Sequence, residues 1–311
     1  MKSKFLLFGI ASIFPGIFKF FAKPTGGTSS AEYCYSVWLR HLIVSNNNGL
    51  KGVPSNVAEI GPGDTLGIGF AALLSGADTY TAFDVHQYAT KEKNIEIFNE
   101  LVWLFKNKSN IPCKESNSRI RPKLNDYSFP TYILSKEILD KSLADERINK
   151  IRNSILNINS GCISYYVPWS GTEIKENSID FIIAQASLEY INNVKEILSY
   201  IRLWLKQDAL ASLVIDYSSH HLSKKWNEHW TYSELLWSLL KGGQPFFPNR
   251  MTHTDYLDLY NDCKFEILAS ERNKKQSAIE RKDLNQKFKK MSEEDLNTAG
   301  GFFVIKKKLL I

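Results

Sequence analysis

The sequence predicts an α/β fold in which helices cover both faces of a seven-stranded, mostly parallel β-sheet. From Val57 onward, short apolar runs alternate with helical stretches, which is typical of a parallel sheet covered on both faces. Hydrophobic residues make up 43% of the 311 residues, an ordinary globular share, and the chain has no internal repeat or low-complexity tract. Disordered, collagen-like and repeat-array structures are therefore poor fits, and one large domain is expected over 31–311.

The cysteine spacing and the net charge indicate which cellular compartment and which kinds of partner suit this chain. The four cysteines lie too far apart for zinc-type pairs or for a disulfide scaffold, so a reducing compartment fits best and a cytoplasmic location is expected. The net charge is +6, and residues 271–311 carry most of the positive excess. Such a mild excess favours a solvated surface over a nucleic-acid partner.

Residues 1–24 form an apolar N-terminal segment. Its uncharged run from Phe5 to Phe18 is shorter than the roughly 20 residues of a membrane span. Two interpretations stay open: a first helix packed on the domain, or an interfacial segment in which residues 1–23 contact the inner face of a membrane through apolar side chains and flanking lysines. The composition of residues 25–30 (TGGTSS) predicts a linker.

The elements of the domain follow in order. A helix is predicted over 32–44, and a second over 70–75 follows the first strand. Residues 86–162 are expected to form an inserted region after the second strand, with helical stretches at 93–106 and 136–158. A later helix over 255–260 is expected to be capped by Thr254. The seven predicted strands are 56–60, 79–84, 163–167, 179–184, 210–216, 264–269 and 302–307.

A glycine-rich loop joins the first strand to the helix over 70–75 and reads EIGPGDTLG from Glu59 to Gly67. Glycines let a backbone turn sharply and approach a ligand closely, which predicts a nucleotide-type cofactor. The dinucleotide fingerprint G-x-G-x-x-G requires a third glycine where this chain has Leu66. Asp84 ends the second strand, where a carboxylate can accept hydrogen bonds from both ribose hydroxyls.

With its E-x-G-x-G-x-x-x-G spacing, the loop resembles the first motif of class I S-adenosylmethionine-dependent methyltransferases. Residues 178–190 (SIDFIIAQASLEY) are similar to the fourth strand and following turn of that superfamily, although Gln185 and Tyr190 stand where Ser and His are common. The resemblance implies a Rossmann-like fold, S-adenosylmethionine as cofactor, and methyl transfer. The expected cofactor-binding residues are Glu59, Gly61, Gly63, Gly67, Asp84, Glu173 and Gln185, with an exposed loop glutamate as the alternative reading of Glu173.

Methyl transfer requires an aligned nucleophile and, for a hydroxyl acceptor, a group that removes its proton. Such groups are expected beyond the carboxyl ends of the strands. His220 and His221 follow the fifth strand and are the candidate general bases, with ordinary surface histidines as the alternative. His229 and Asp216 are nearby in sequence, but the spacings match no compact metal site, so no metal is expected.

The acceptor is harder to infer. Trp226, Trp230 and Trp237 share one predicted helix face and are either core residues or an aromatic wall for a sugar or lipid. Arg250 could bind an acceptor phosphate or carboxylate, or a helix C-terminus. We expect a small-molecule or glycan acceptor, with a sugar or lipid-linked glycan hydroxyl favoured and with residues 86–162 shaping its pocket. An NAD-dependent oxidoreductase and a non-catalytic cofactor-binding adaptor of the same fold stay open.

Overall fold

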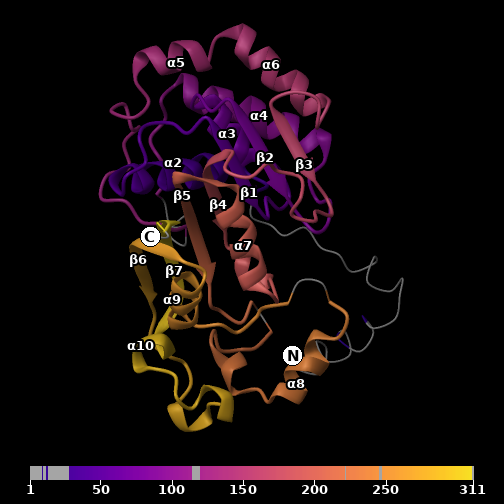
Figure 1. The fold of residues 1–311 in the computed structure, drawn as a ribbon, viewed down its shortest axis with the longest axis vertical. Helices are drawn as coiled ribbons and strands as arrows, with labels where there is room; N and C mark the ends of the chain where they lie inside the picture. Colours follow the sequence, from indigo (N-terminus) through magenta and orange to yellow (C-terminus); the bar gives the residue numbers. More distant parts are fainter. Residues whose placement is uncertain are drawn as a thin grey trace.

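The computed structural model describes residues 28–113, 120–220, 222–244 and 247–309, together with Gly9 and Ser12. Seven strands form one sheet in the order β3-β2-β1-β4-β5-β7-β6, and only β7 runs antiparallel to its neighbours (Figure 1). The α/β prediction with a mostly parallel sheet is confirmed. The strands are β1 Asn56–Ile60, β2 Thr79–Phe83, β3 Ile163–Tyr166, β4 Ile179–Gln185, β5 Leu205–Asp216, β6 Phe265–Lys274 and β7 Thr298–Lys307.

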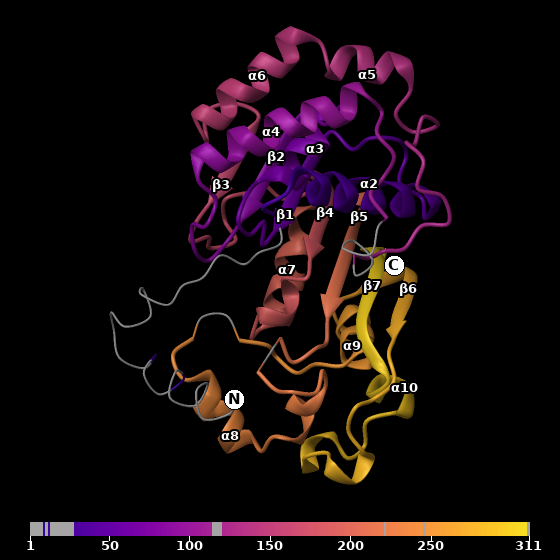
Figure 2. The same ribbon diagram turned by 180° about the vertical axis from the view of Figure 1, so that it is seen from behind.

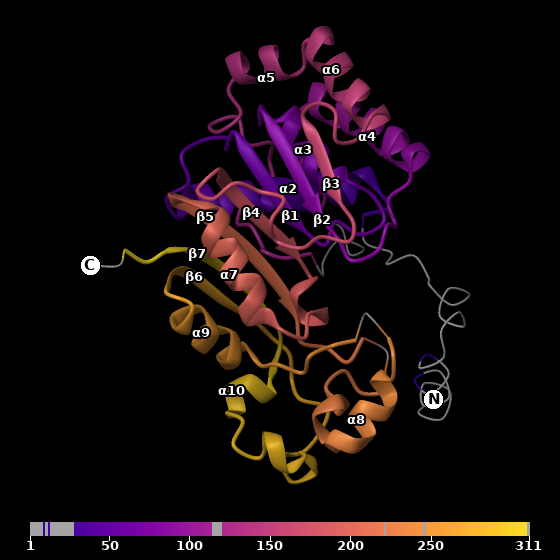
Figure 3. The same ribbon diagram turned by 45° about the vertical axis from the view of Figure 1, so that its right-hand side comes forward.

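Helices cover both faces of this sheet. On one face α2 packs on α3 and α4, and on the other α7 and α9 bury their apolar sides against β4, β5 and β7 (Figures 2 and 3). Two apolar cores result, one on each face. The helices are α2 Ala31–Asn47, α3 Gly67–Leu74, α4 Lys91–Lys106, α5 Lys136–Ser142, α6 Asp145–Leu156, α7 Val194–Trp204, α8 Glu234–Lys241, α9 His253–Asp262 and α10 Glu293–Leu296.

Several element boundaries differ from the sequence prediction, and three of the differences have a structural explanation. The helix predicted over 136–158 is divided into two helices, α5 and α6, which pack on different neighbours. Both contact α3, and α6 also contacts α4 and β3. α9 begins at His253 instead of residue 255, because Thr252 and Asp255 form a reciprocal capping box and Thr254 is not the cap. β5 begins at Leu205 because the chain stays extended through a register shift opposite β4.

The region between β2 and β3 contains α4, α5 and α6, which stack on the layer of α2 and α3, and α6 also contacts the edge strand β3 (Figure 1). Its stretch between α4 and α5 packs along α2 through a buried arginine. Arg40 donates to the carbonyl oxygens of Pro112 and Pro122 at 3.1 and 2.9 Å, and Tyr35 donates to that of Ser109 at 2.5 Å. These hydrogen bonds therefore hold the stretch against α2, which covers one face of the sheet.

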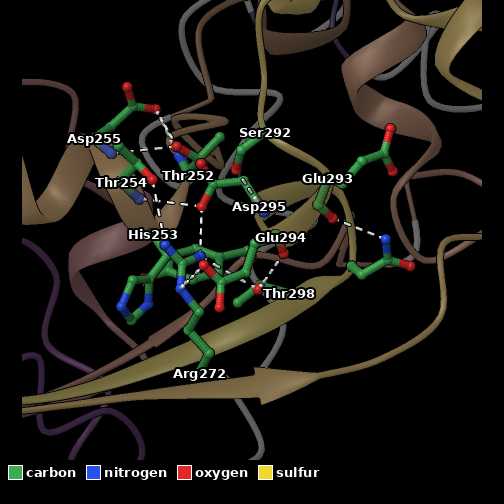
Figure 4. A network of polar contacts seen from close by, with 12 residues as sticks. Thr252, His253, Thr254, Asp255, Arg272, Ser292, Glu293, Glu294, Asp295 and Thr298 are labelled. Atoms are coloured by element: carbon green, nitrogen blue, oxygen red, sulfur yellow. Dashed lines mark hydrogen bonds and ion pairs between the residues drawn. The ribbon is translucent and has the colours of Figure 1, made fainter.

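A network of polar contacts joins the last helices to the β6–β7 hairpin (Figure 4). Asp295 is buried and accepts from Arg272 at 2.6 Å and from the backbone N–H of Thr254 at 3.3 Å. Arg272 also donates to Thr298 at 3.4 Å. Asp295 of α10 thus links the start of α9 to Arg272 of β6, and Arg272 in turn bonds to Thr298 of β7, which joins α9 and α10 to the antiparallel end of the sheet.

Most of the apolar N-terminal segment, and with it the prediction of an interfacial segment, lies outside the described residues. Of that segment the structure describes Gly9 and Ser12. Ser12 Oγ accepts from the backbone N–H of Gly243, just beyond α8, at 2.9 Å. In the part of the chain that the structure describes, every helix is too short or too polar to cross a bilayer.

Candidate functional site

The order of the strands reverses between β1 and β4, which are neighbours in the sheet although β2 and β3 separate them in sequence. Open α/β sheets bind ligands at the carboxyl ends of the strands at such a point. The glycine loop follows β1 there. Gly61 and Gly63 have φ of 75° and 76°, the left-handed region that favours glycine. A Cβ on Gly61 would lie 2.5 Å from the Cβ of Ser187, so this glycine also lets the loop approach the chain after β4.

The later glycines of the motif serve packing. A Cβ on Gly67 would lie 2.5 Å from Cys34 Sγ of α2, and one on Gly69 would overlap the ring of Tyr80 on β2. Close packing therefore accounts for glycine at position 67, and the assignment of Gly67 to the cofactor site stays a prediction. The helix α3 needs these small residues because α2 and the Tyr80 ring press directly against its first turn.

Glu59 occupies the interior of β1, beneath the loop. It is 1% exposed and accepts a hydrogen bond from the Tyr80 hydroxyl. Burial raises the pKa of Glu59 to about 8, with the Tyr80 hydrogen bond opposing the rise and the charge of Asp84 adding to it. The acidic residue of the motif is thus a buried carboxyl group with a raised pKa that is hydrogen-bonded to Tyr80.

Backbone N–H groups at the start of α3 are already bonded to protein oxygens. The N–H of Thr65 donates to Thr28 Oγ1 at 2.9 Å, that of Leu66 to Asn94 Oδ1 at 3.0 Å, and that of Gly67 to Thr65 Oγ1 at 3.2 Å. A pyrophosphate is held by bare N–H groups at a helix N-terminus. These three N–H groups are not available to one.

Sequence reasoning missed two of the residues that hold this loop. The linker prediction over 25–30 is wrong at its described end, because Thr28 is buried and also donates to the carbonyl oxygen of Pro62 at 2.9 Å. Thr28 carries no sequence signal of this role. Asn94 does carry one, since it is a polar residue on the apolar stripe that Ile97, Phe98 and Leu101 form along α4.

Asp84 lies at the tip of β2, next to the loop. Its carboxylate accepts from the backbone N–H groups of Val85 and His86 at 2.8 and 3.5 Å, and the N–H of Gly63 also faces it. Burial raises the pKa of Asp84, and these N–H groups offset part of the rise. The structure therefore brings together Gly63 and Asp84, the two features expected to meet an adenosine.

Glu173 and Gln185 are engaged elsewhere. The Glu173 carboxylate accepts from the backbone N–H groups of Ser170 and Gly171 at 2.5 and 2.8 Å, and this loop packs on α7 through Gly171. Gln185 Oε1 lies 2.9 Å from the Nε2 atom of His41 on α2. In the structure, Glu173 closes a turn within its own loop and Gln185 joins the sheet to α2, and their cofactor contacts stay predictions.

Beyond β4 and β5, a second set of polar side chains converges. His220 Nδ1 lies 2.8 Å from the Tyr190 hydroxyl, and its Nε2 lies 3.9 Å from Glu189 Oε1. Burial, and secondarily the charge of Asp216, raises the pKa of Glu189 well above its usual range. The predicted base His220 is thus part of a half-buried cluster, whereas His221 lies outside the described residues.

The aromatic residues after His220 are core residues. Trp230 and Trp237 are buried beside His229, whose pKa burial lowers well below its usual range. Arg250 donates to the carbonyl oxygens of His229 and Tyr232 and pairs with Glu234 at 2.5 Å, so it does not face an acceptor. Because these side chains contact other parts of the protein, they no longer favour a sugar or a lipid as the acceptor. Among the described residues, no group of three or more His, Cys, Asp and Glu side chains could hold a metal ion.

Neither protein-family models nor curated proteins match the sequence. Solved structures with a similar fold include phosphoethanolamine N-methyltransferase 2 of Haemonchus contortus (14% identity, 95% of this chain and 61% of that one, TM-score 0.46). A candidate methyltransferase of Bacillus halodurans (9%, 86% and 99%, 0.43) and the [4+2]-cyclase SpnF (12%, 88% and 81%, 0.41) are also similar. Such low identities concern the fold and assign no reaction.

Proposed function

We propose that this chain binds S-adenosylmethionine at the ends of β1 and β2 and directs its methyl group to an acceptor held at the ends of β4 and β5. The proposal rests on one observation: backbone N–H groups at the start of α3 are already hydrogen-bonded to side chains of the protein. Thr28, Asn94 and Thr65 side chains occupy three N–H groups that a pyrophosphate would need, while Asp84 stands beside Gly63. A cofactor with a ribose and no phosphate fits this arrangement.

The residues present fit such a cofactor in two respects. Asp84 would accept from the ribose hydroxyls, and Gly63, with its positive φ and no side chain, leaves room for a ligand above the loop. Bound S-adenosylmethionine supplies an electrophilic methyl group on a sulfonium. The chain's own contribution is to hold the acceptor in line and to accept its proton, for which His220 is the candidate base.

The acceptor that this base suits is a hydroxyl of a small molecule or glycan. A hydroxyl must lose its proton as its oxygen attacks a methyl group, and an imidazole that titrates near neutral pH can take that proton. An NAD-dependent oxidoreductase is the weaker alternative. The pyrophosphate of NAD needs free N–H groups at a helix N-terminus, and those at the start of α3 are already hydrogen-bonded.

Isothermal titration calorimetry of the full chain with S-adenosylmethionine, S-adenosylhomocysteine and NAD tests the proposal. We expect the first two to bind and NAD not to bind. Asp84→Asn should weaken S-adenosylmethionine at least about tenfold, because it removes a charged acceptor of hydroxyl hydrogen bonds. Asp78→Asn, at the exposed residue that precedes β2, is the matched control and should leave the affinity unchanged. Binding of NAD alone, or of none of the three, contradicts the proposal.

A further inference from the structure

Glu189 is a buried carboxylic acid without an evident structural purpose. It is 2% exposed, and neither carboxyl oxygen makes a hydrogen bond within the described part of the chain, although backbone N–H groups of Glu189 and Asp216 approach it. A buried carboxylate without partners is costly, so such a group is normally paired or protonated. The His220 ring lies beside it, with Nε2 3.9 Å from Oε1.

The two ring nitrogens of His220 face different partners. Nδ1 meets the Tyr190 hydroxyl at 2.8 Å, and Nε2 faces Glu189. The backbone of His220 has a φ of 45°, an uncommon conformation for a residue with a side chain, and it holds the ring between these two neighbours. A neutral imidazole in this position accepts the Tyr190 proton at Nδ1 and carries its own proton on Nε2, toward the carboxyl group.

We propose that Glu189, His220 and Tyr190 form a proton relay, in which the Tyr190 hydroxyl is the group that touches the acceptor and His220 receives its proton. The inference rests on the methyl-transfer function proposed above. It changes the role of His220: because its nitrogens face Tyr190 and Glu189, His220 acts through Tyr190 instead of contacting the acceptor itself. Glu189 is a positioning residue that balances the charge of the imidazolium.

The relay conserves atoms and charge. The acceptor oxygen forms a bond to the methyl carbon as the bond between carbon and sulfur breaks, with its electron pair staying on sulfur. The acceptor proton moves to the Tyr190 oxygen while the Tyr190 proton moves to His220 Nδ1. The imidazolium then lies beside Glu189 and favours the ionised form of this buried carboxyl group. Glu189 releases one proton to bulk water as it ionises, and exchange with bulk water restores the neutral ring and the protonated carboxyl group after product release.

The cluster can be tested without an acceptor by NMR of the full-length protein with labelled histidine, His220 being assigned from a His220→Gln variant. The ¹⁵N shifts of the unmutated protein should show Nδ1 as the unprotonated nitrogen of neutral His220. In Glu189→Gln, the titration midpoint of His220 should fall by about one unit, because the carboxylate that an imidazolium favours at Glu189 can no longer form beside the ring. In Tyr190→Phe, the preference for that tautomer should weaken.

Other charged groups face the cluster, so a matched control is needed. Asp216 at the end of β5 lies near Glu189, and His229 lies near His220. Asp216→Asn should move the His220 midpoint by less than half as much as Glu189→Gln. An equal shift in both variants, or a neutral His220 protonated at Nδ1, overturns the relay. Calorimetry with S-adenosylmethionine separates the two proposals, since a failed relay leaves that affinity untouched.

Discussion

The buried Glu59 makes a quantitative prediction about stability and pH. Its folded pKa is raised from an ordinary 4.5 to about 8, chiefly by burial. Between these values the folded chain binds a proton that the unfolded chain has released. The stabilisation is therefore fully present below pH 4.5 and is lost as the pH rises toward 8. The slope is about 1.4 kcal/mol per pH unit, or roughly 2–3 kcal/mol between pH 5.5 and 7.5.

The Glu59→Gln variant keeps the side-chain shape and removes the titration. Urea unfolding at a series of pH values from 5.5 to 7.5 should give a free energy of unfolding that falls with pH in the unmutated chain. The variant should lack that part of the fall, about 2–3 kcal/mol. Glu92→Gln, which changes an exposed glutamate on α4, is the control and should keep the original slope. If the Glu59→Gln variant keeps that slope too, the Glu59 carboxyl group is ionised in the folded chain, and the prediction of a raised pKa is wrong.

Three further changes test other parts of the structure. Thr28→Val should weaken S-adenosylmethionine about tenfold in calorimetry, because it frees the Thr65 N–H and loosens the loop; an unchanged affinity would separate Thr28 from the site. Asp295→Asn should cost about 2–3 kcal/mol in urea unfolding because it leaves Arg272 partly unpaired, whereas a cost near zero would show that the network adds no stability. Deleting residues 1–23 should abolish sedimentation with anionic vesicles, which we propose this segment contacts, and retained sedimentation would contradict that.

The sequence allowed prediction of the features that local pattern determines. Strand positions follow from apolar runs, and the meeting of Gly63 with Asp84 follows from where parallel strands end. Partners that come from distant parts of the chain were beyond prediction. Gln185 contacts His41, 144 positions away, and the choice between that bond and a ligand depends on where α2 crosses the sheet. The turn that Glu173 closes depends in the same way on a distant part of the chain, because its loop packs on α7.

The glycine motif illustrates why such a pattern is ambiguous. A glycine permits close approach of any neighbour, and the sequence does not say whether that neighbour is a ligand or another element of the protein. Here Gly61, Gly67 and Gly69 are each explained by a protein side chain that occupies the place of a Cβ. The discriminating information lies in the N–H groups of the same loop. Because Thr28 and Asn94 already accept from two of them, the start of α3 offers fewer N–H donors to a phosphate, which is the argument for our proposal of a cofactor without one.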